Sequence, residues 1–205
     1  MDEKLIPDIV VGRLPLYLRA LQHLAQEGRQ VTSSQELGER LGISPAQIRK
    51  DLSLFGEFGK QGTGYEIDYL VDQLRQILHI TRVWDIVVVG AGDIGSAVAR
   101  YQGFANRGFA VKMIFDNNPQ VIGTQIGNFV AQDSSQLGQV IQEQAIKIAM
   151  IAVPASQAQE VADKLVEAGI QAILNYAPIS LNVPPEVRVQ NIDPATHLQR
   201  MTYYI

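Results

Sequence analysis

A glycine-rich segment, Gly90-Ala91-Gly92-Asp93-Ile94-Gly95, has the spacing of loops that bind the phosphates of a dinucleotide. Residues 85–89 before it predict a buried strand, and a helical pattern follows it. In such a loop the first glycine permits a tight turn and the second lets the backbone approach the pyrophosphate. The third lets the helix pack closely on the strand, so that the amino terminus of the helix faces the phosphates. The whole segment is therefore a candidate cofactor site.

Asp116 ends the next predicted strand and is the second candidate in this site. A carboxylate at this position can hydrogen-bond the ribose of an adenosine, which favours NAD(H) over its 2′-phosphorylated form. The alternative interpretation is a turn, because Asp116-Asn117-Asn118-Pro119 is a good turn sequence in its own right. Asp93 suits the helix dipole, but it would repel a pyrophosphate if it turned toward it.

Two later segments also end predicted strands. Ligands of open parallel sheets bind at the carboxyl ends of the strands. The candidates there are Val153 and Pro154 in one segment, and Asn175, Tyr176, Ala177 and Pro178 in the other. The alternative is that the two prolines only terminate the strands.

A different chemistry, the reading of DNA bases, is indicated in the first third of the chain. Ser33 and Glu36 fit a capping box that opens a helix running to Leu41. Gly42 suits the end of that helix, and Ser44-Pro45-Ala46-Gln47 suits the start of another. Two short helices joined by a glycine-containing turn predict a helix-turn-helix.

The second of these helices separates an apolar face from a polar one. Ile48, Leu52 and Phe55 recur at i, i+4 and i+7 and are expected to face the core. The other face then presents side chains suited to base edges and phosphates. These candidates are Gln47, Arg49, Lys50 and Ser53.

Glycines on both sides of Lys60 and Gln61 predict a β-hairpin after the helix-turn-helix. A hairpin in this order is the wing of a winged helix, and Lys60 could reach the DNA backbone. The alternative is a small helical domain with a solvated charged face. Since the local positive charge is mild, we expect tight binding only from a dimer that reads two half-sites.

The elements that must position these candidate sites can be inferred from the hydrophobic pattern, which changes near residue 82. Before it, apolar residues such as Leu14, Leu18 and Leu21 recur at helical spacing. After it, β-rich runs at 85–89, 111–115, 147–153 and 170–174 alternate with helical stretches near 94–107, 134–144 and 156–168. Apolar strands separated by helices predict a parallel sheet covered on both faces.

The sequence therefore predicts an α/β protein with an N-terminal winged-helix domain and a C-terminal Rossmann-like domain. The first spans residues 1–82, with the helix-turn-helix at about 17–56 and the wing at 58–67. The second spans residues 83–192 and binds NAD(H). Residues 193–205 predict a final helix, at about 194–204, which Asp193 caps.

Composition excludes several classes of protein. The 205 residues contain no cysteine, which excludes disulfide scaffolds, cysteine-ligated zinc and thiol catalysis. The apolar runs are too short to span a membrane, and no signal core follows the charged start. We expect a cytoplasmic protein without a metal. Its net charge of −4 means that DNA binding must depend on a local element.

The sequence also argues against an enzyme. A dehydrogenase needs an acid or base beside the hydride acceptor, yet His23, His79 and His197 all fall on predicted helices outside the Rossmann-like core. No tyrosine is followed four residues later by lysine. An NAD-dependent oxidoreductase with an accessory helical domain is the enzymatic alternative. A DNA-binding protein that binds coenzyme A instead is another, because similar βαβ domains occur in acyl-CoA ligases.

Short segments over nearly the whole chain carry a family resemblance. They are Tyr17-Leu18-Arg19, Gln47-Ile48-Arg49-Lys50-Asp51-Leu52-Ser53, Phe55-Gly56, Gly62-Thr63-Gly64-Tyr65, the loop Gly90–Gly95, Tyr101-Gln102-Gly103-Phe104, Phe115-Asp116, Ala168-Gly169-Ile170, Asn175-Tyr176-Ala177-Pro178 and Asn191-Ile192-Asp193. Together they resemble the bacterial redox-sensing repressors called Rex. Few other families would carry both the Arg-Lys-Asp-Leu and the Asn-Tyr-Ala-Pro segments.

The resemblance implies a homodimer that binds double-stranded operator DNA when NADH is scarce and releases it when NADH is abundant. It also implies that the final helix is exchanged between subunits, beside the partner's nicotinamide pocket. Asp193 would then act as a switch together with Tyr101 and Arg19. This chain departs from the family pattern at Asp93, where asparagine or a basic residue is common, and at Pro194, where a bulky apolar residue often stands.

Overall fold

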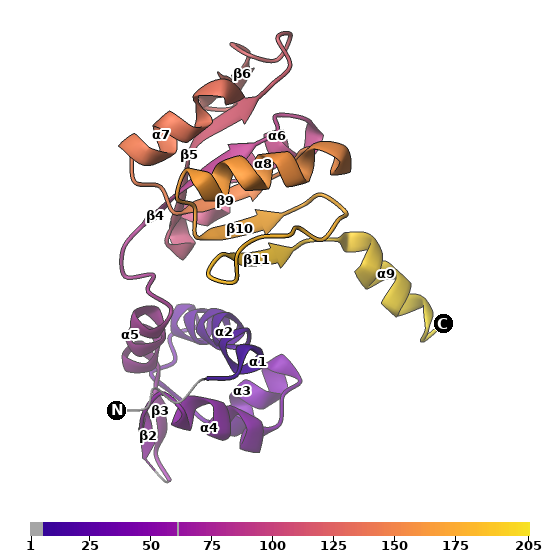
Figure 1. The fold of residues 1–205 in the computed structure, drawn as a ribbon. Helices are drawn as coiled ribbons and strands as arrows, with labels where there is room; N and C mark the ends of the chain where they lie inside the picture. Colours follow the sequence, from indigo (N-terminus) through magenta and orange to yellow (C-terminus); the bar gives the residue numbers. More distant parts are fainter. Residues whose placement is uncertain (1–5, 61) are drawn as a thin grey trace. The chain divides into compact units, whose positions relative to one another are not determined.

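The computed structural model describes residues 6–60 and 62–205 of the chain, apart from the side chain of Lys60. The chain forms two compact units, Met1–Arg82 and Val83–Ile205 (Figure 1). Each unit has its own apolar core. Within the described residues, the structure contains no helix with the length and hydropathy needed to cross a bilayer.

The first unit is a winged helix. Its described helices are α1 (Asp8–Val11), α2 (Leu14–Gln26), α3 (Ser34–Leu41), α4 (Pro45–Ser53) and α5 (Ile67–Ile77). Its described strands are β1 (Val31–Thr32), β2 (Gly59–Lys60) and β3 (Gly64–Glu66), which form a sheet in the order β1-β3-β2. The core forms where α2 and α5 pack against α3 and α4, through residues such as Leu21, Leu37, Ile48 and Leu70.

The local signals of the helix-turn-helix are confirmed. The Ser33 hydroxyl accepts a hydrogen bond from the backbone N–H of Glu36, and the Ser44 hydroxyl accepts one from that of Gln47. Gly42 has the left-handed conformation, with φ of 66°, that ends α3. These caps fix where α4 begins and hence which of its residues are exposed.

Three details of this unit correct the sequence-based expectations. Ile67 does not belong to the wing, because the side chain of Glu66 caps α5 by accepting from the backbone N–H of Tyr69. Phe55 lies beyond the end of α4, although it still packs against the core. His79 likewise follows the end of α5, in a left-handed conformation that stops the helix.

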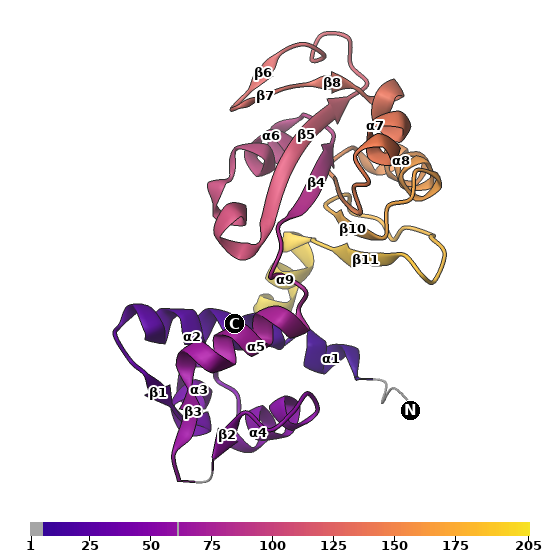
Figure 2. The same ribbon diagram turned by 90° about the vertical axis from the view of Figure 1, so that its left-hand side faces the viewer.

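The second unit, described throughout, contains a sheet of six parallel strands in the order β11-β10-β9-β4-β5-β8 (Figures 1 and 2). These strands are β4 (Trp84–Val89), β5 (Phe109–Asp116), β8 (Gln132–Asp133), β9 (Ile148–Ile151), β10 (Ala172–Asn175) and β11 (Arg188–Asn191). Strands β6 (Gln125–Ile126) and β7 (Phe129–Val130) form a separate hairpin.

Helices cover both faces of this sheet, as alternation along β4 requires. Val87 and Val89 face α7 (Leu137–Glu143) and α8 (Ala155–Glu167). Ile86 and Val88 face α6 (Asp93–Arg100) and the β6–β7 hairpin. The parallel sheet confirms the Rossmann-like fold, and the winged helix confirms the other part of the expected architecture.

The stretch near 94–107 is not one helix. The α-helix α6 ends at Arg100, Tyr101 is extended, and the 3₁₀ segment η1 follows at Gln102–Arg107. The ring of Tyr101 lies against Gly103 and packs edge-on against Phe104 at 4.9 Å between centroids, so the break turns this tyrosine back over the next segment. A short 3₁₀ segment, η2 (Ser134–Gln136), likewise precedes α7. The last helix, α9 (Pro194–Thr202), ends slightly before its expected limit.

Candidate functional site

The dinucleotide candidate lies where the chain order of the sheet reverses. From β4 the chain continues to β5 on one side and later to β9 on the other, which opens a crevice beyond the carboxyl ends of these strands. A cavity of about 440 Å³ occupies this place. Its lining includes Gly90, Gly92, Asp116, Val153 and Pro154. The fold thus brings together the main candidates from three separate parts of the sequence.

The three glycines of the loop have different roles in the structure. Gly90 has φ of 98°, and a Cβ there or at Gly95 would collide with backbone atoms. The fold itself therefore requires these two glycines. Gly92 has an ordinary φ of −66°, and among the described residues a Cβ there would meet no atom within 4 Å outside its own chain neighbours and helix. The protein leaves open space beside Gly92, as the approach of a pyrophosphate requires.

Helix α6 offers a site for anions at the same place. Gly92 is its N-cap residue, and no side chain caps the helix. The first backbone N–H groups of a helix seek acceptors, and phosphate oxygens are suitable ones. Asp93 is exposed in the first turn. The uncapped helix, the open space and the cavity fit the pyrophosphate of a dinucleotide.

Asp116 connects the ends of two strands. One carboxylate oxygen accepts from the backbone N–H of Ala91 at 2.7 Å, and the other from that of Asn118 at 2.8 Å. The second bond is the turn that the sequence suggested. The first holds the glycine loop in place, and the carboxylate still lines the cavity. A carboxylate oxygen can accept more than one hydrogen bond. Asp116 could therefore accept from a ribose hydroxyl while it keeps its bonds to Ala91 and Asn118.

The segment Asn175–Pro178 does not contribute to the lining of this cavity. Asn175 is fully buried, and its amide donates to the carbonyl of Ile179 at 2.9 Å and to the side chain of Asn191 at 3.0 Å. Its own oxygen accepts from the backbone N–H of Ala177. Asn175 therefore joins β10 to β11 and to the loop between them. A cofactor role for Tyr176, Ala177 and Pro178 stays a prediction.

The DNA candidate is the exposed face of α4. Arg49, Lys50 and Ser53 are exposed, whereas Ile48 and Leu52 are buried. The guanidinium of Arg49 donates to the Ser34 hydroxyl at 2.8 Å, next to the start of α3. A groove of about 1150 Å³ lies beside these residues, and Ser33, Arg49, Ser53 and Gly62 contribute to its lining. The surface offers positive and hydroxyl groups to a duplex; the Lys60 side chain lies outside the described structure.

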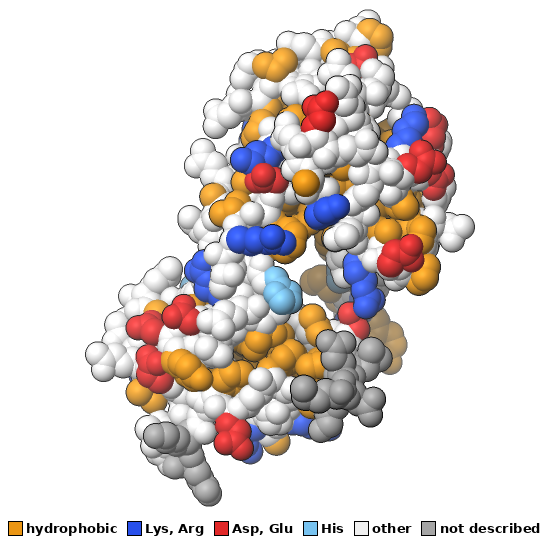
Figure 3. Space-filling view, turned by 60° about the vertical axis from the view of Figure 1, so that its left-hand side comes forward, with side chains coloured by type: hydrophobic (Ala, Val, Ile, Leu, Met, Phe, Trp, Pro, Cys, Tyr) orange, Lys and Arg blue, Asp and Glu red, His pale blue; other side chains and the backbone are white. Residues whose placement is uncertain are grey.

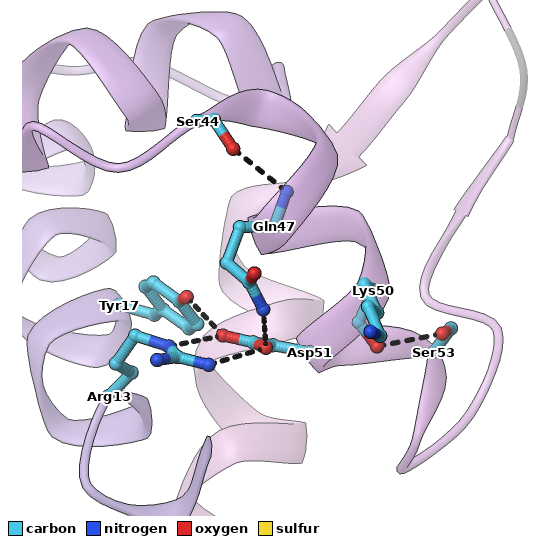
Figure 4. A network of polar contacts seen from close by, with 7 residues as sticks. All are labelled: Arg13, Tyr17, Ser44, Gln47, Lys50, Asp51 and Ser53. Carbon is cyan, nitrogen blue, oxygen red and sulfur yellow. Dashed lines mark hydrogen bonds and ion pairs between the residues drawn. The ribbon is translucent and has the colours of Figure 1, made fainter. Parts of the chain in front are cut away.

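Gln47 does not point outward as the sequence predicted. Its side-chain amide donates to Asp51 at 2.6 Å (Figure 4). Asp51, which sequence reasoning overlooked, is completely buried on α4. It also accepts two hydrogen bonds from Arg13 and one from Tyr17. One polar cluster therefore connects α4 with the amino-terminal end of α2.

The hydrogen bonds of this cluster favour the ionised form of Asp51. Burial alone would raise the pKa of Asp51, but the hydrogen bonds from Arg13, Tyr17 and Gln47 outweigh it and lower that pKa. Burial, followed by the hydrogen bond to Asp51, raises the pKa of Tyr17 well above its ordinary value. Asp51 is therefore an anion and Tyr17 a neutral donor at neutral pH.

Figure 3 shows charged side chains of both signs, Lys and Arg as well as Asp and Glu, among the described residues of both units. This distribution agrees with the net charge of −4. DNA recognition by such a protein depends on specific contacts from one element more than on bulk charge.

The three switch candidates lie on different elements. Arg19 is exposed on α2, and Tyr101 is half exposed at the end of α6. Asp193 caps α9, where it accepts from the backbone N–H of Ala195 and from the Thr196 hydroxyl. These two bonds lower the pKa of Asp193, so the residue is ionised. Their grouping across a dimer stays a prediction.

Family models match both units. A model described as "Putative DNA-binding protein N-terminus" matches residues 5–53. Another, described as "CoA binding domain", matches residues 81–179. The two matches fall on the winged helix and on the Rossmann-like sheet.

Curated relatives match the chain over nearly its full length. A "Redox-sensing transcriptional repressor Rex" of Chloroflexus aggregans is 52% identical over 199 residues, which are 97% of this chain and 94% of that protein. The protein of the same name from Desulfitobacterium hafniense is 43% identical over 200 residues, 98% of this chain and 95% of its own.

Solved structures of a Rex-family repressor share the fold. RSP in complex with β-NAD⁺ and operator DNA has a TM-score of 0.93 and 37% identity, covering 98% of this chain and 93% of that one. RSP in complex with β-NADH has a TM-score of 0.89 and 35% identity, with coverages of 98% and 94%.

Proposed function

The chain belongs to the family of redox-sensing transcriptional repressors Rex, and we propose that it binds operator DNA when NADH is scarce and releases it when NADH binds. Family membership makes it a repressor that responds to the NADH/NAD⁺ ratio, and not an enzyme. Because it acts on operator DNA and on the NAD(H) pool, we place it in the cytoplasm.

The observation that carries this proposal is the pairing of two separate sites in one chain. The winged helix presents Arg49 and Lys50 on the exposed face of α4. The Rossmann-like unit leaves open space at Gly92, beside the uncapped start of α6. A ligand that binds at the second site can regulate the first only by favouring one of two conformations.

Different residues of the crevice would bind different parts of the cofactor. The N–H groups at the start of α6 would hold the pyrophosphate, and Asp116 would hold the adenosine ribose. Val153 and Pro154 line the same cavity on the other side of β4. The nicotinamide supplies the signal, because its ring loses a positive charge on reduction.

A dimer is supported by the surface of α9. Leu198 and Met201 are about 60% exposed there, and Tyr203, Tyr204 and Ile205 after it are more exposed still. An exposed apolar helix of this kind is typical of an interaction surface. The exchange of this helix between two subunits would cover these side chains and would give the two half-site contacts that weak local charge requires.

The direct test is a titration of the operator complex with each nucleotide. We expect NADH to release DNA at much lower concentrations than NAD⁺. NADPH should be weak, because Asp116 disfavours a 2′-phosphate. Equal release by NADH and NAD⁺ would contradict the proposed function.

Coenzyme A is the second candidate ligand, because the family model matched to residues 81–179 carries that description. The same titration distinguishes the two ligands. Release by coenzyme A in place of NADH would assign the crevice to coenzyme A. We expect no release by coenzyme A.

The switch prediction concerns Tyr101, Asp193 and Arg19. We expect Tyr101→Phe and Asp193→Ala to bind operator DNA normally but to need more NADH for release. The physical reason is that an ionised Asp193 would be attracted by the positive ring of NAD⁺ and freed by NADH to accept from Tyr101 or to pair with Arg19. Arg19→Ala should uncouple the two sites.

The measurement is the NADH concentration that releases half of the bound operator. Thr202→Ala is a control, because this exposed residue is on α9 but only bonds back to its own helix. If all three variants release DNA at the wild-type NADH concentration, Asp193 is only a helix cap and the triad is wrong.

A further inference from the structure

We propose that Asp51 is a positioning residue for the operator: its buried carboxylate fixes the rotation of α4 against the amino-terminal end of α2, so that Arg49 and Lys50 project toward the DNA. This inference rests on the proposed DNA-binding function and adds a residue that does not itself touch the duplex. The residues involved and their contacts are drawn in Figure 4.

The carboxylate is bound from three directions. The Arg13 guanidinium donates to both of its oxygens, at 2.6 and 2.8 Å, in a bidentate arrangement. The Tyr17 hydroxyl donates at 2.6 Å, and the Gln47 amide at 2.6 Å. Arg13 is the N-cap residue of α2 and Tyr17 lies in its first turn, whereas Gln47 lies one helical turn before Asp51 on α4.

This arrangement restrains rotation more than an apolar contact would. A planar guanidinium and a planar carboxylate joined by two hydrogen bonds have one preferred relative orientation. The burial of apolar side chains such as Ile48 and Leu52 is stabilised by a non-directional effect, so it restrains rotation less. Since consecutive residues of a helix differ by about 100° in direction, holding Asp51 inward determines where Arg49 and Lys50 point.

The cluster is also an inefficient means of increasing stability. A buried ion pair must overcome the loss of hydration of both charges, and well-packed apolar residues often stabilise a fold as well or better. Orientation is the benefit that an ion pair gives and an apolar contact does not. The cluster lies on the inner side of the same helix whose outer side is the DNA candidate, so orientation is what binding needs there.

Gln47 helps to hold Asp51 in place and does not read bases in this interpretation. The sequence suggested that it reads bases, but its amide nitrogen is committed to Asp51. We therefore assign Gln47 to the positioning cluster.

The test compares specific with nonspecific DNA binding in Asp51→Asn. The operator probe is a duplex that the wild-type protein selects from a random pool, and the second probe is a scrambled duplex of equal length. We expect Asp51→Asn to lose at least tenfold in operator affinity while its affinity for the scrambled duplex at low salt changes less than threefold. NADH binding, measured by the fluorescence of NADH itself, should not change.

Two further variants keep the proposal falsifiable if Asp51→Asn is unstable. Tyr17→Phe removes one donor and keeps the ring, and we expect a loss of about three- to tenfold for the operator alone. Asp72→Asn makes the same chemical change at an exposed position of α5 and should bind both probes like wild type. Thermal unfolding of each variant shows that binding is measured on folded protein.

Arg13→Gln provides a separate check on the cluster. If Arg13 and Asp51 act together, the double variant Arg13→Gln/Asp51→Asn should lose less free energy of operator binding than the sum of the losses in the two single variants. Additive losses would argue against a shared cluster.

The outcomes separate this inference from the proposed function. If wild-type protein does not prefer its selected operator, the proposed function fails. If wild type does and the folded variants of Asp51 and Tyr17 bind it within twofold of wild type, the positioning role fails. Equal losses for operator and scrambled duplex would also overturn it, because a purely structural role predicts that result.

Discussion

Replacement of Arg49 or Lys50 by alanine should weaken operator binding by about 30-fold or more and leave NADH binding intact. Both side chains are exposed on α4, opposite the buried Ile48 and Leu52. A good bidentate contact to a base contributes about 1–3 kcal/mol of discrimination, and a dimer makes it at two half-sites. The combined loss of about 2–6 kcal/mol corresponds to roughly 30-fold to more than 10⁴-fold in affinity.

Fluorescence anisotropy of a labelled operator at one fixed salt concentration measures this loss. Constant salt matters, because every lost phosphate contact also changes the salt dependence. Lys112→Ala is the matched control, since it removes one exposed positive charge from the second unit. Wild-type affinity in both Arg49→Ala and Lys50→Ala would show that α4 is not the recognition helix.

Substitution of Gly92 by valine should produce a repressor that binds DNA and ignores NADH. The backbone at Gly92 is one that any residue adopts, and an added Cβ would meet no atom of the described residues within 4 Å beyond its chain neighbours and helix. The fold should therefore tolerate the side chain, at a cost of about 1 kcal/mol for a weaker N-cap residue. The added methyl groups would occupy the space that the pyrophosphate needs, and the loss of NADH affinity should exceed 100-fold.

Two controls make the Gly92 experiment specific. Ala97→Val places valine on an exposed position of the same helix and should respond to NADH like wild type. Gly95→Ala should instead destabilise the whole second unit, because its Cβ would collide with the Gly90 carbonyl. Normal NADH-dependent release by Gly92→Val would remove the glycine loop from the cofactor site.

Much of this structure was predictable because its signals are local. Ser33, Gly42 and Ser44 determine the limits of α3 and α4 through contacts within four residues, so the helix-turn-helix can be inferred from sequence alone. The glycine loop was also predictable. Two of its glycines are required by close contacts in the fold, whereas no such contact requires Gly92.

Other features depend on contacts between distant residues. Asp51 reaches Arg13 and Tyr17, more than thirty positions earlier in the chain. One sequence signal could have revealed it: Asp51 lies three residues after Ile48 and beside Leu52, so a helix that buries them also turns Asp51 inward. A charged residue in that position requires partners.

The edges of the sheets were missed for a different reason. Strands β1 and β8 have only two residues each, too few for a period to be visible. Strand β11 is polar, and it is held to β10 by backbone pairing and by the Asn175–Asn191 bond. These edge strands form because an adjacent strand is available for backbone pairing. Their own residues do not indicate that pairing.

The central claim is that NADH and operator DNA compete through one conformational equilibrium, and the affinity for NADH with and without operator tests it most directly. Coupling between two sites is reciprocal, so the factor by which NADH weakens operator binding must equal the factor by which the operator weakens NADH binding. We predict at least a tenfold loss of NADH affinity in the presence of saturating operator, and no such loss with a scrambled duplex. Equal NADH affinities for free and operator-bound protein would contradict the account.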